Sequence, residues 1–307
     1  MDRRTLIKAL SYGTLSVAGG HLGWRLASSR PDEPTLPDLP LAPELQRVEP
    51  TADEGGAVEE PTVVDRVDDP AYLQKIRDFD RSFEDDVILE GDRLALLQST
   101  ARRLTKAQRV IGHGHFNLVS FDDLIRYGRR YRSIGAFTRE QLDFIDEIFH
   151  AEATDYGFYG DKVLTEMTTE IAERECVKVS GTGHYLFRGE AHEKYVQMRK
   201  DLDNNIFLTS GIRNVVKQTQ LFIDKAVTTE GNLSQASRSL APPGYSYHAV
   251  GDFDIGKVGA GLDNFTEVFA ETDEYKKLVD LGYMELRYTP TNPFGVRHEP
   301  WHIKMRA

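Results

Sequence analysis

The chain has 307 residues and a formal net charge of -11 at pH 7, with 49 acidic residues against 38 lysines and arginines. This length allows one large domain or two ordinary domains, each with its own hydrophobic core. Because no stripe of lysine and arginine offsets the acidic residues, the composition argues against a nucleic-acid-binding protein. The single cysteine, Cys176, excludes an intramolecular disulfide and a metal cluster built from several cysteines of one chain.

Residues 1–29 are expected to form an export signal. Arg3 and Arg4 precede the apolar residues Leu6 and Ile7, and the weakly apolar run ALSYGTLSVAGGHLGW follows. This arrangement resembles a bacterial twin-arginine signal and indicates a periplasmic or cell-envelope location. The run is short for a membrane span of roughly 20 residues, although an uncleaved signal could remain as a membrane tether. The alternative is an ordinary amphipathic first helix of a cytosolic protein.

Residues 30–66 are expected to form a disordered linker. Prolines recur through this segment among acidic residues, and aromatic residues are few. Such a composition buries too little apolar surface to offset the entropy of ordering the chain. We interpret the segment as a tether between the signal and the folded part.

Residues 67–172 are expected to form a helical region, because apolar residues recur three and four positions apart in several of its segments. Ser120 and Thr138 are plausible N-terminal caps with acidic residues close behind. His113 and His115 would point the same way in a strand and could share a metal ion. No carboxylate of suitable spacing follows closely, so a loop or structural role is the favoured interpretation of these histidines.

Residues 173–307 alternate short β-like runs with helical patterns. The expected strands are CVKVS, NNIFLTSG, GDFDIG, YMELRYT and WHIKM, and the expected helices are EKYVQMRKDL, IRNVVKQTQLFIDKAV and NFTEVFAETDEYKKLVDLG. The fold class is therefore α+β, with a small, mainly antiparallel sheet flanked by helices and preceded by the helical region.

Candidate metal ligands and carboxylates gather in two short stretches of this last region. His248 is followed closely by Asp252 and Asp254, and the segment EPWH places Glu299 three residues before His302. Zinc catalysis requires about three protein ligands, an open coordination position and a nearby carboxylate. These five residues can supply that set.

The order of the motifs carries a resemblance. The segments SGIRNVVKQ (210–218), SYHAVGDFDIG (246–256) and EPWH (299–302) resemble motifs of the zinc D-alanyl-D-alanine carboxypeptidases and dipeptidases of the vancomycin-resistance type. Together they cover roughly residues 175–307, and none of residues 66–170 takes part.

This resemblance implies a zinc ion held by His248 and His302. It also implies that Glu299 is the general base and that Arg213 stabilises the oxyanion or holds a substrate carbonyl. Supporting roles fall to Ser246, Gln218 and Trp301, the last of which is expected to pack the strand that fixes its neighbours.

The third ligand is less clear, because the family usually places an aspartate seven residues after the histidine, where this chain has Ile255. A one-residue deletion after Gly251 aligns Asp254 with that ligand. Asp252 is the alternative, and the aspartate that does not bind zinc is expected to lie just outside the ligand shell. A third interpretation makes both aspartates ordinary turn carboxylates.

The expected protein is an exported zinc metallopeptidase that hydrolyses peptidoglycan stem peptides, most simply as a D-alanyl-D-alanine carboxypeptidase. Alternatives are a peptidoglycan L,D-carboxypeptidase or endopeptidase on the same scaffold, or a non-catalytic, zinc-containing module that binds cell-wall peptides. A carboxypeptidase needs a cationic group for the terminal carboxylate of its substrate, and Arg238 and Arg287 are candidates. The sequence does not indicate an oligomeric state.

Overall fold

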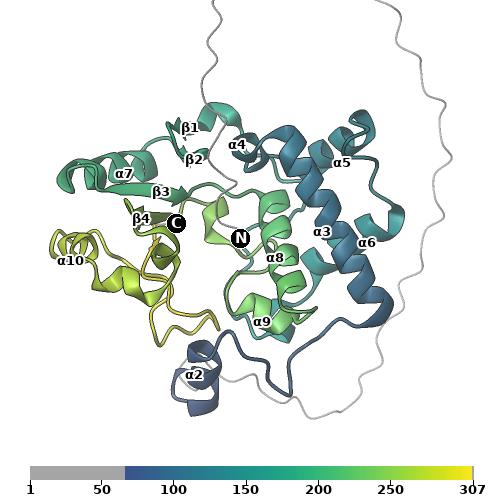
Figure 1. Ribbon diagram of the computed structural model, residues 1–307, viewed down its shortest axis with the longest axis horizontal. Coiled ribbons are helices and arrows are strands. Elements are labelled where there is room, and N and C mark those ends of the chain that lie inside the picture. The colour runs from purple at the N-terminus through teal and green to yellow at the C-terminus, as the bar shows by residue number, and fades with distance from the viewer. Residues whose placement is uncertain (1–65, 306–307) are drawn as a thin grey trace, which may run out of the picture. The chain divides into compact units, whose positions relative to one another are not determined.

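The computed structural model describes residues 66–305, which belong to one compact unit. The expected signal and nearly all of the expected linker lie outside the described residues. Helices occupy the first half of the unit (Figure 1). In chain order these are α2 (Pro70–Arg77), α3 (Gly91–Ile111), α4 (His113–Phe116), α5 (Phe121–Arg130), α6 (Arg139–His150) and the 3₁₀ turns η1 (Ala153–Tyr156) and η2 (Glu173–Glu175).

The second half mixes short strands with helices, as the α+β prediction requires, and that prediction is confirmed. Its elements are β1 (Cys176–Val179), β2 (His184–Phe187), α7 (Glu190–Asp201), β3 (Ile206–Ser210), α8 (Val215–Thr228), α9 (Leu233–Ser237), η3 (Tyr247–Ala249), β4 (Phe253–Lys257), η4 (Gly261–Phe265), η5 (Glu267–Glu271), α10 (Asp273–Asp280) and β5 (His302–Ile303).

One hydrophobic core joins the helical first half to the second half. Leu97 and Leu104 of α3 lie in the same buried cluster as Phe222 and Ile223 of α8. Figure 1 shows α3 and α8 side by side in the right half of the molecule. Burial of such side chains stabilises the fold by about 1.5–3 kcal/mol each. The domain boundary expected near residue 172 stays a prediction, and this core crosses it.

A three-stranded antiparallel sheet of order β3-β4-β5 forms the centre of the second half. Its apolar side covers a second buried cluster that includes Phe253, Ile255, Trp301 and Ile303. β1 and β2 form a separate antiparallel hairpin, of which only β1 was expected from the sequence.

Two local predictions from the sequence are wrong. The segment YMELRYT (283–289) is irregular and contributes one bridge, Leu286 to Ile303. Its partner β5 is only two residues long, so there is little edge with which a longer strand could pair. The segment expected as one helix at 264–282 is α-helical only in α10 and has the 3₁₀ turn η5 before it. His113 and His115, for which a loop or structural role was favoured, lie in the short helix α4.

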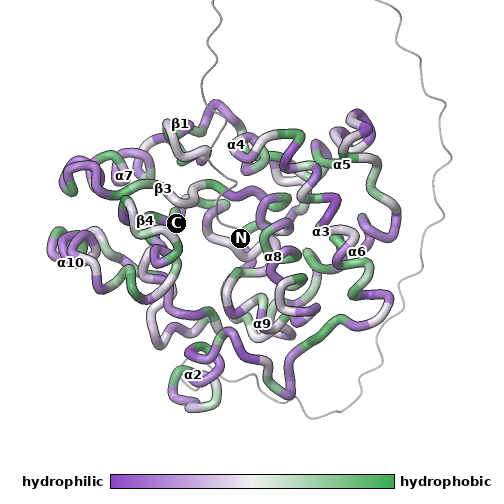
Figure 2. Tube along the Cα trace, in the orientation of Figure 1, coloured by the Kyte–Doolittle hydropathy of each residue, from purple (hydrophilic) through white to green (hydrophobic). Residues whose placement is uncertain are grey.

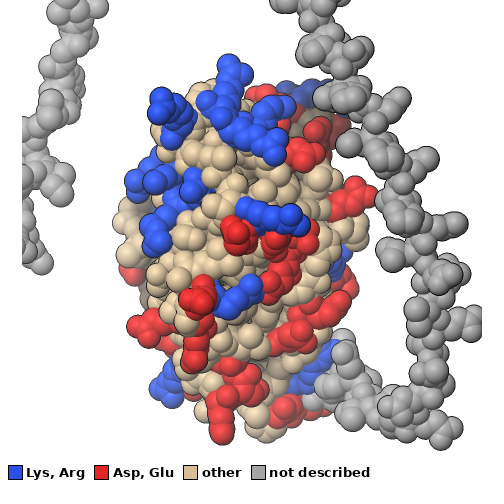
Figure 3. Space-filling view, turned by 90° about the vertical axis from the view of Figure 1, so that its right-hand side faces the viewer, with Lys and Arg blue, Asp and Glu red and all other residues tan. Residues whose placement is uncertain are grey.

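The surface is unevenly charged. On the face seen in Figure 3, Lys and Arg side chains gather towards the top, whereas Asp and Glu are frequent over the middle and lower part. Figure 2 shows mainly hydrophilic residues in α7 at the left margin, as expected for an exposed helix. Among the residues that the structure describes, no helix has the length and apolar character needed to cross a membrane.

Candidate metal centre

The register of the central sheet brings Asp254 and His302 together. Asp254 of β4 pairs with His302 of β5 on one side and with Ser210 of β3 on the other. Directly opposite residues of an antiparallel pair present their side chains on one face, about 4.5–5.5 Å apart at Cβ. Asp254 Oδ1 accordingly lies 3.0 Å from His302 Nδ1. The register shifts between Leu208 and Ser210, a bulge of the kind that often lies next to functional sites.

His248 reaches the same place from the 3₁₀ turn η3. Its Nδ1 donates a hydrogen bond to the carbonyl oxygen of Gly211 at 2.8 Å, and its Nε2 lies 3.3 Å from Asp254 Oδ1. Because a carbonyl oxygen can only accept, Nδ1 carries the proton and the Nε2 lone pair faces the aspartate. Gly211 itself packs closely against β2, where a Cβ would lie 2.0 Å from the carbonyl oxygen of Tyr185, so a side chain at this position would displace the carbonyl that His248 contacts.

His248, Asp254 and His302 therefore form a compact buried group. Each offers one potential ligand atom, and these atoms all lie within 4.8 Å of one another. Burial holds the pKa of His248 below its usual value, and the neighbouring Arg213 acts in the same direction. Although burial opposes ionisation of Asp254, His248 and Arg213 hold its pKa well below the usual range. The sites predicted from the sequence thus meet at one point of the fold.

Asp252 lies on the opposite edge of the His302 ring. Its Oδ2 is 2.9 Å from His302 Nε2, and it also accepts hydrogen bonds from Arg287 Nε at 2.6 Å and from the Met305 amide at 2.8 Å. Burial alone would raise the pKa of Asp252, but the bonds from His302 and Arg287 lower it to about 2. Asp252 therefore orients His302 and stands apart from the group formed with His248.

Arg213 is fixed between the sheet and α8. Its Nε donates to Ser210 Oγ at 2.7 Å, and one terminal nitrogen donates to Asp254 Oδ2 at 2.5 Å. The next residue, Asn214, caps α8 and donates side-chain hydrogen bonds to the carbonyls of Leu118 and Thr169. The helical first half, whose role the sequence left open, thus supports the segment that carries Arg213.

Glu299 is a buried carboxylate beside the three candidate ligands. Its Oε2 lies 3.9 Å from His302 Nδ1, and its Oε1 lies 3.9 Å from Arg297 Nε. Burial raises the pKa of Glu299 to about 7, against the opposing effect of His302 and Arg297. A carboxyl group with such a pKa can both accept and donate a proton near neutral pH.

The residues expected to have supporting roles surround the same space. Gln218 of α8 donates to the carbonyl of Ala241 at 2.6 Å. Ser246 is buried at the start of η3. Trp301 packs in the core beneath the sheet, and its carbonyl accepts a hydrogen bond from the Ile255 amide at 3.0 Å.

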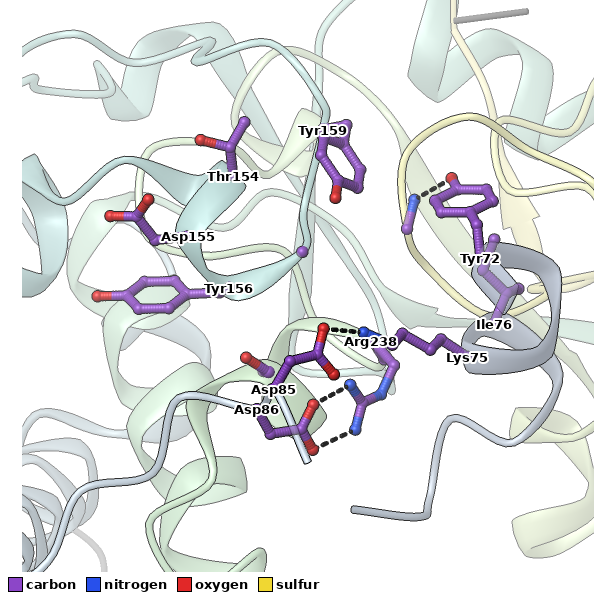
Figure 4. Close-up of a pocket in the computed structure, with 13 residues that line it drawn as sticks. Tyr72, Lys75, Ile76, Asp85, Asp86, Thr154, Asp155, Tyr156, Tyr159 and Arg238 are labelled. Carbon is purple, nitrogen blue, oxygen red and sulfur yellow. Dashed lines mark hydrogen bonds and ion pairs between the residues drawn. The ribbon is translucent and has the colours of Figure 1, made fainter. Parts of the chain in front are cut away.

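The two arginines considered for the substrate carboxylate lie elsewhere. Arg238 forms a buried ion pair with Asp86, at 2.7 and 2.9 Å, which Figure 4 shows as two dashed contacts next to α2. Arg287 binds Asp252 and stacks on the Tyr247 ring with its guanidinium carbon 3.4 Å from the ring centroid. Neither residue lines the pocket that contains the three candidate ligands.

That pocket has a volume of about 360 Å³. Its lining includes the three candidate ligands, Arg213 and Glu299. It also includes residues that were not predicted from the sequence, namely His184, Lys217, Lys225, Tyr288 and Arg297. Burial lowers the pKa of His184 to about 4, with a further contribution from Arg213. Lys217 and Lys225 lie four and twelve residues after Arg213, and their separation of eight residues could have placed them on one helix face in advance.

Comparison with known proteins agrees with the motif resemblance. Residues 186–307 match the model of the VanY family, described as D-alanyl-D-alanine carboxypeptidase. The resemblance to vancomycin-resistance-type peptidases is therefore confirmed for this part of the chain. No curated protein matches the chain significantly.

Three similar solved structures each cover 42% of this chain. The LdcB LD-carboxypeptidase is 23% identical with a TM-score of 0.36, and the match spans 62% of that chain. A variant of the vancomycin-resistance D,D-pentapeptidase VanY in complex with Zn(II) is 24% identical, with a TM-score of 0.34 and 76% of that chain covered. VanYB in complex with D-alanine-D-alanine is 24% identical, with a TM-score of 0.33 and 75% covered.

Proposed function

We propose that the protein is a zinc-dependent hydrolase of peptidoglycan stem peptides, and specifically a D-alanyl-D-alanine carboxypeptidase. The observation that carries this proposal is the buried group of His248, Asp254 and His302, whose potential ligand atoms lie within 4.8 Å of one another. This group lines the same pocket as the carboxylate of Glu299 and the guanidinium of Arg213.

The donor set fits zinc. Imidazole nitrogens and a carboxylate oxygen are ligands that zinc accepts, and three protein ligands leave one coordination position open, as in catalytic sites. Each histidine is oriented by a hydrogen bond from its other nitrogen, His248 to Gly211 and His302 to Asp252. We therefore assign His248, Asp254 and His302 as ligands, and Asp252 as the residue that orients His302.

Zinc in this position supplies a Lewis acid for hydrolysis of a peptide bond. Glu299, buried 3.9 Å from His302, is the group that accepts a proton from water and returns it to the leaving amine. Arg213 uses two of its five N–H groups for Ser210 and Asp254, so further donors remain to face the oxygen on which negative charge develops.

Export and a cell-envelope location belong to the same proposal. They rest on Arg3, Arg4 and the weakly apolar run behind them, together with a substrate that lies outside the cytoplasm. A retained signal would tether the enzyme to the membrane.

Mass spectrometry of products from defined muropeptides with stems of four and five residues tests the function. We expect one zinc per chain and release of a single D-alanine from the five-residue stem. Cleavage of the four-residue stem would indicate an L,D-carboxypeptidase, and cleavage within cross-links would indicate an endopeptidase. If the zinc-loaded protein cleaved none of these substrates, the proposed activity would be wrong.

A further inference from the structure

Cations line one wall of the catalytic pocket. Lys217, Leu221 and Lys225 succeed each other at intervals of four residues along α8, so they lie on one face of the helix. With a rise of about 1.5 Å per residue, the backbones of Lys217 and Lys225 are about 12 Å apart. That wall therefore carries positive charge well beyond Arg213, in a protein whose net charge is -11.

A second cation lines the same pocket as Lys225. This is Arg297, whose charge contributes, after burial, to the lowered pKa of Lys225. The Arg297 guanidinium is held between two rings, with its central carbon 4.6 Å from the Phe79 centroid and 4.8 Å from the Trp301 centroid. Stacking of this kind fixes the plane of the guanidinium before any ligand arrives.

Arg297 forms a loose ion pair with a nearby acidic group. Glu299 Oε1 lies 3.9 Å from Arg297 Nε, which is too far for a hydrogen bond, and the Nε–H is buried without a hydrogen-bond partner among the described residues. The exposed Asp80 raises the pKa of Lys225, against the larger effects of burial and of Arg297. Two partly buried cations in one pocket, one of them with an unpaired donor, are costly unless an anion joins them.

We propose that Lys225 and Arg297 together bind a carboxylate of the substrate peptide, at a position separate from the contacts of Arg213 with the reacting bond. This inference rests on the proposed function, because it assigns the pocket's occupant as a peptide acid. A planar guanidinium and an ammonium that line one pocket can each donate to one carboxylate, and such charge-assisted bonds are stronger than neutral ones. Arg238 and Arg287 cannot take this role, since carboxylates already engage both.

Binding of matched peptides to the full-length, zinc-loaded Glu299→Gln protein tests the inference without turnover. Three peptides are compared by calorimetry: a five-residue stem with all carboxylates free, the same stem amidated at its C-terminus, and the same stem amidated at its internal carboxylate. We expect one of the two amides to bind at least tenfold more weakly than the free acid, which identifies the carboxylate that is recognised.

The Lys225→Met substitution, added to that protein, provides the decisive comparison. We expect this substitution to weaken binding of the free acid about tenfold. The amide that binds weakly to the parent protein should bind equally weakly to the variant, so the preference for the free acid over that amide disappears. Lys225→Arg should restore the preference. Lys276→Met, which removes an exposed lysine of α10, is the charge-matched control and should change nothing.

Two results would overturn the inference: unchanged affinity of Lys225→Met for all three peptides, or an equal loss for all three. The second would show a general change in the pocket. Arg297→Lys, which keeps the charge but loses the planar fork, provides an independent check and should reduce the same preference. If the wild-type protein binds with this preference but hydrolyses no stem peptide, the proposed function fails while the carboxylate site stands.

Discussion

Two buried arginine–aspartate pairs in this protein have opposite characters. Arg238 binds both oxygens of Asp86 and also donates to two backbone carbonyls, while Asp86 accepts further bonds from Asn232 and the Phe83 amide. Both partners are thus saturated by the protein itself. This pair links the segment after α2, which carries Asp86, to the C-terminal end of α9, where Arg238 lies.

The pair of Arg213 and Asp254, by comparison, is not closed off by other protein groups and borders a larger pocket. Asp254 shares its oxygens among Arg213, His302 and His248, and all four residues line a pocket of about 360 Å³. Arg238 and Asp86 also line a pocket, of about 120 Å³, but the protein itself already uses their hydrogen bonds, whereas Asp254 lies with two histidines whose potential ligand atoms converge. Burial, ion pairing and a neighbouring cavity therefore do not by themselves mark a functional site.

The largest effect is expected from Glu299→Gln. Removing the proposed general base should lower kcat by about 10²–10⁴-fold, while zinc content stays at one per chain, because Glu299 lies beside the proposed ligands and is not one of them. Steady-state kinetics and metal analysis measure the two quantities. Glu271→Gln, an exposed control, should behave as wild type. Full activity of Glu299→Gln would show that another residue acts as the base.

The two aspartates are expected to differ in zinc affinity. Asp254→Ala removes a proposed ligand and should weaken zinc binding by more than 100-fold. Asp252→Ala releases only the orientation of His302 and should weaken it by about 10–100-fold. Competition with a chromophoric chelator gives both constants. The reverse order would mean that Asp252 is the ligand.

The saturated pair should matter for stability. Asp86→Ala leaves the Arg238 charge buried without its partner and should lower the free energy of unfolding by about 3–5 kcal/mol. Its neighbour Asp85, which pairs with Lys75 at the surface, is a matched control, and Asp85→Ala should cost about 0–1 kcal/mol. Urea titration measures both variants. Equal losses of stability in the two variants would show that the buried Arg238–Asp86 pair contributes no more than the surface pair.

The smallest expected effect is the pH dependence of the stability that Asp86 contributes. Burial opposes ionisation of Asp86, but hydrogen bonds from Arg238, Asn232 and the Phe83 amide outweigh it and lower its pKa. A lowered pKa in the folded state contributes stability above the unfolded value of about 3.9 and loses it as pH falls through the folded pKa. The stability difference between wild type and Asp86→Ala should therefore be constant near neutral pH and shrink below about pH 4. A difference that grew on acidification would contradict this assignment.

Much of the metal centre could be predicted from the sequence, because its ligand types lie in short motifs with fixed order. The position of Asp252 could not, since it depends on the strand register that sets Asp254 opposite His302 and leaves Asp252 at the other nitrogen. The motifs indicated that one of the two aspartates binds zinc and that the other lies just outside the ligand shell. In the structure Asp254 lies at His302 Nδ1, beside His248, whereas Asp252 lies at His302 Nε2.

Long-range packing explains the other limits. No local pattern reveals that Arg297 is clamped between Phe79 and Trp301, which lie on different elements, or that Arg238 is already paired with Asp86. The helical first half likewise carries no motif, yet its carbonyls at Leu118 and Thr169 hold Asn214 next to Arg213. Most helix positions could be predicted from periodicity, although 264–282 is α-helical only in α10. YMELRYT failed as a strand because its neighbour is too short to pair with it.

A crystal structure of the zinc-loaded protein, with anomalous data at the zinc edge, tests the central claim most directly. We expect one strong peak within about 2.0–2.2 Å of His248 Nε2, Asp254 Oδ1 and His302 Nδ1. Asp252 should keep its hydrogen bond to His302 Nε2. A peak bound by Asp252, or no peak in this pocket, would contradict this claim.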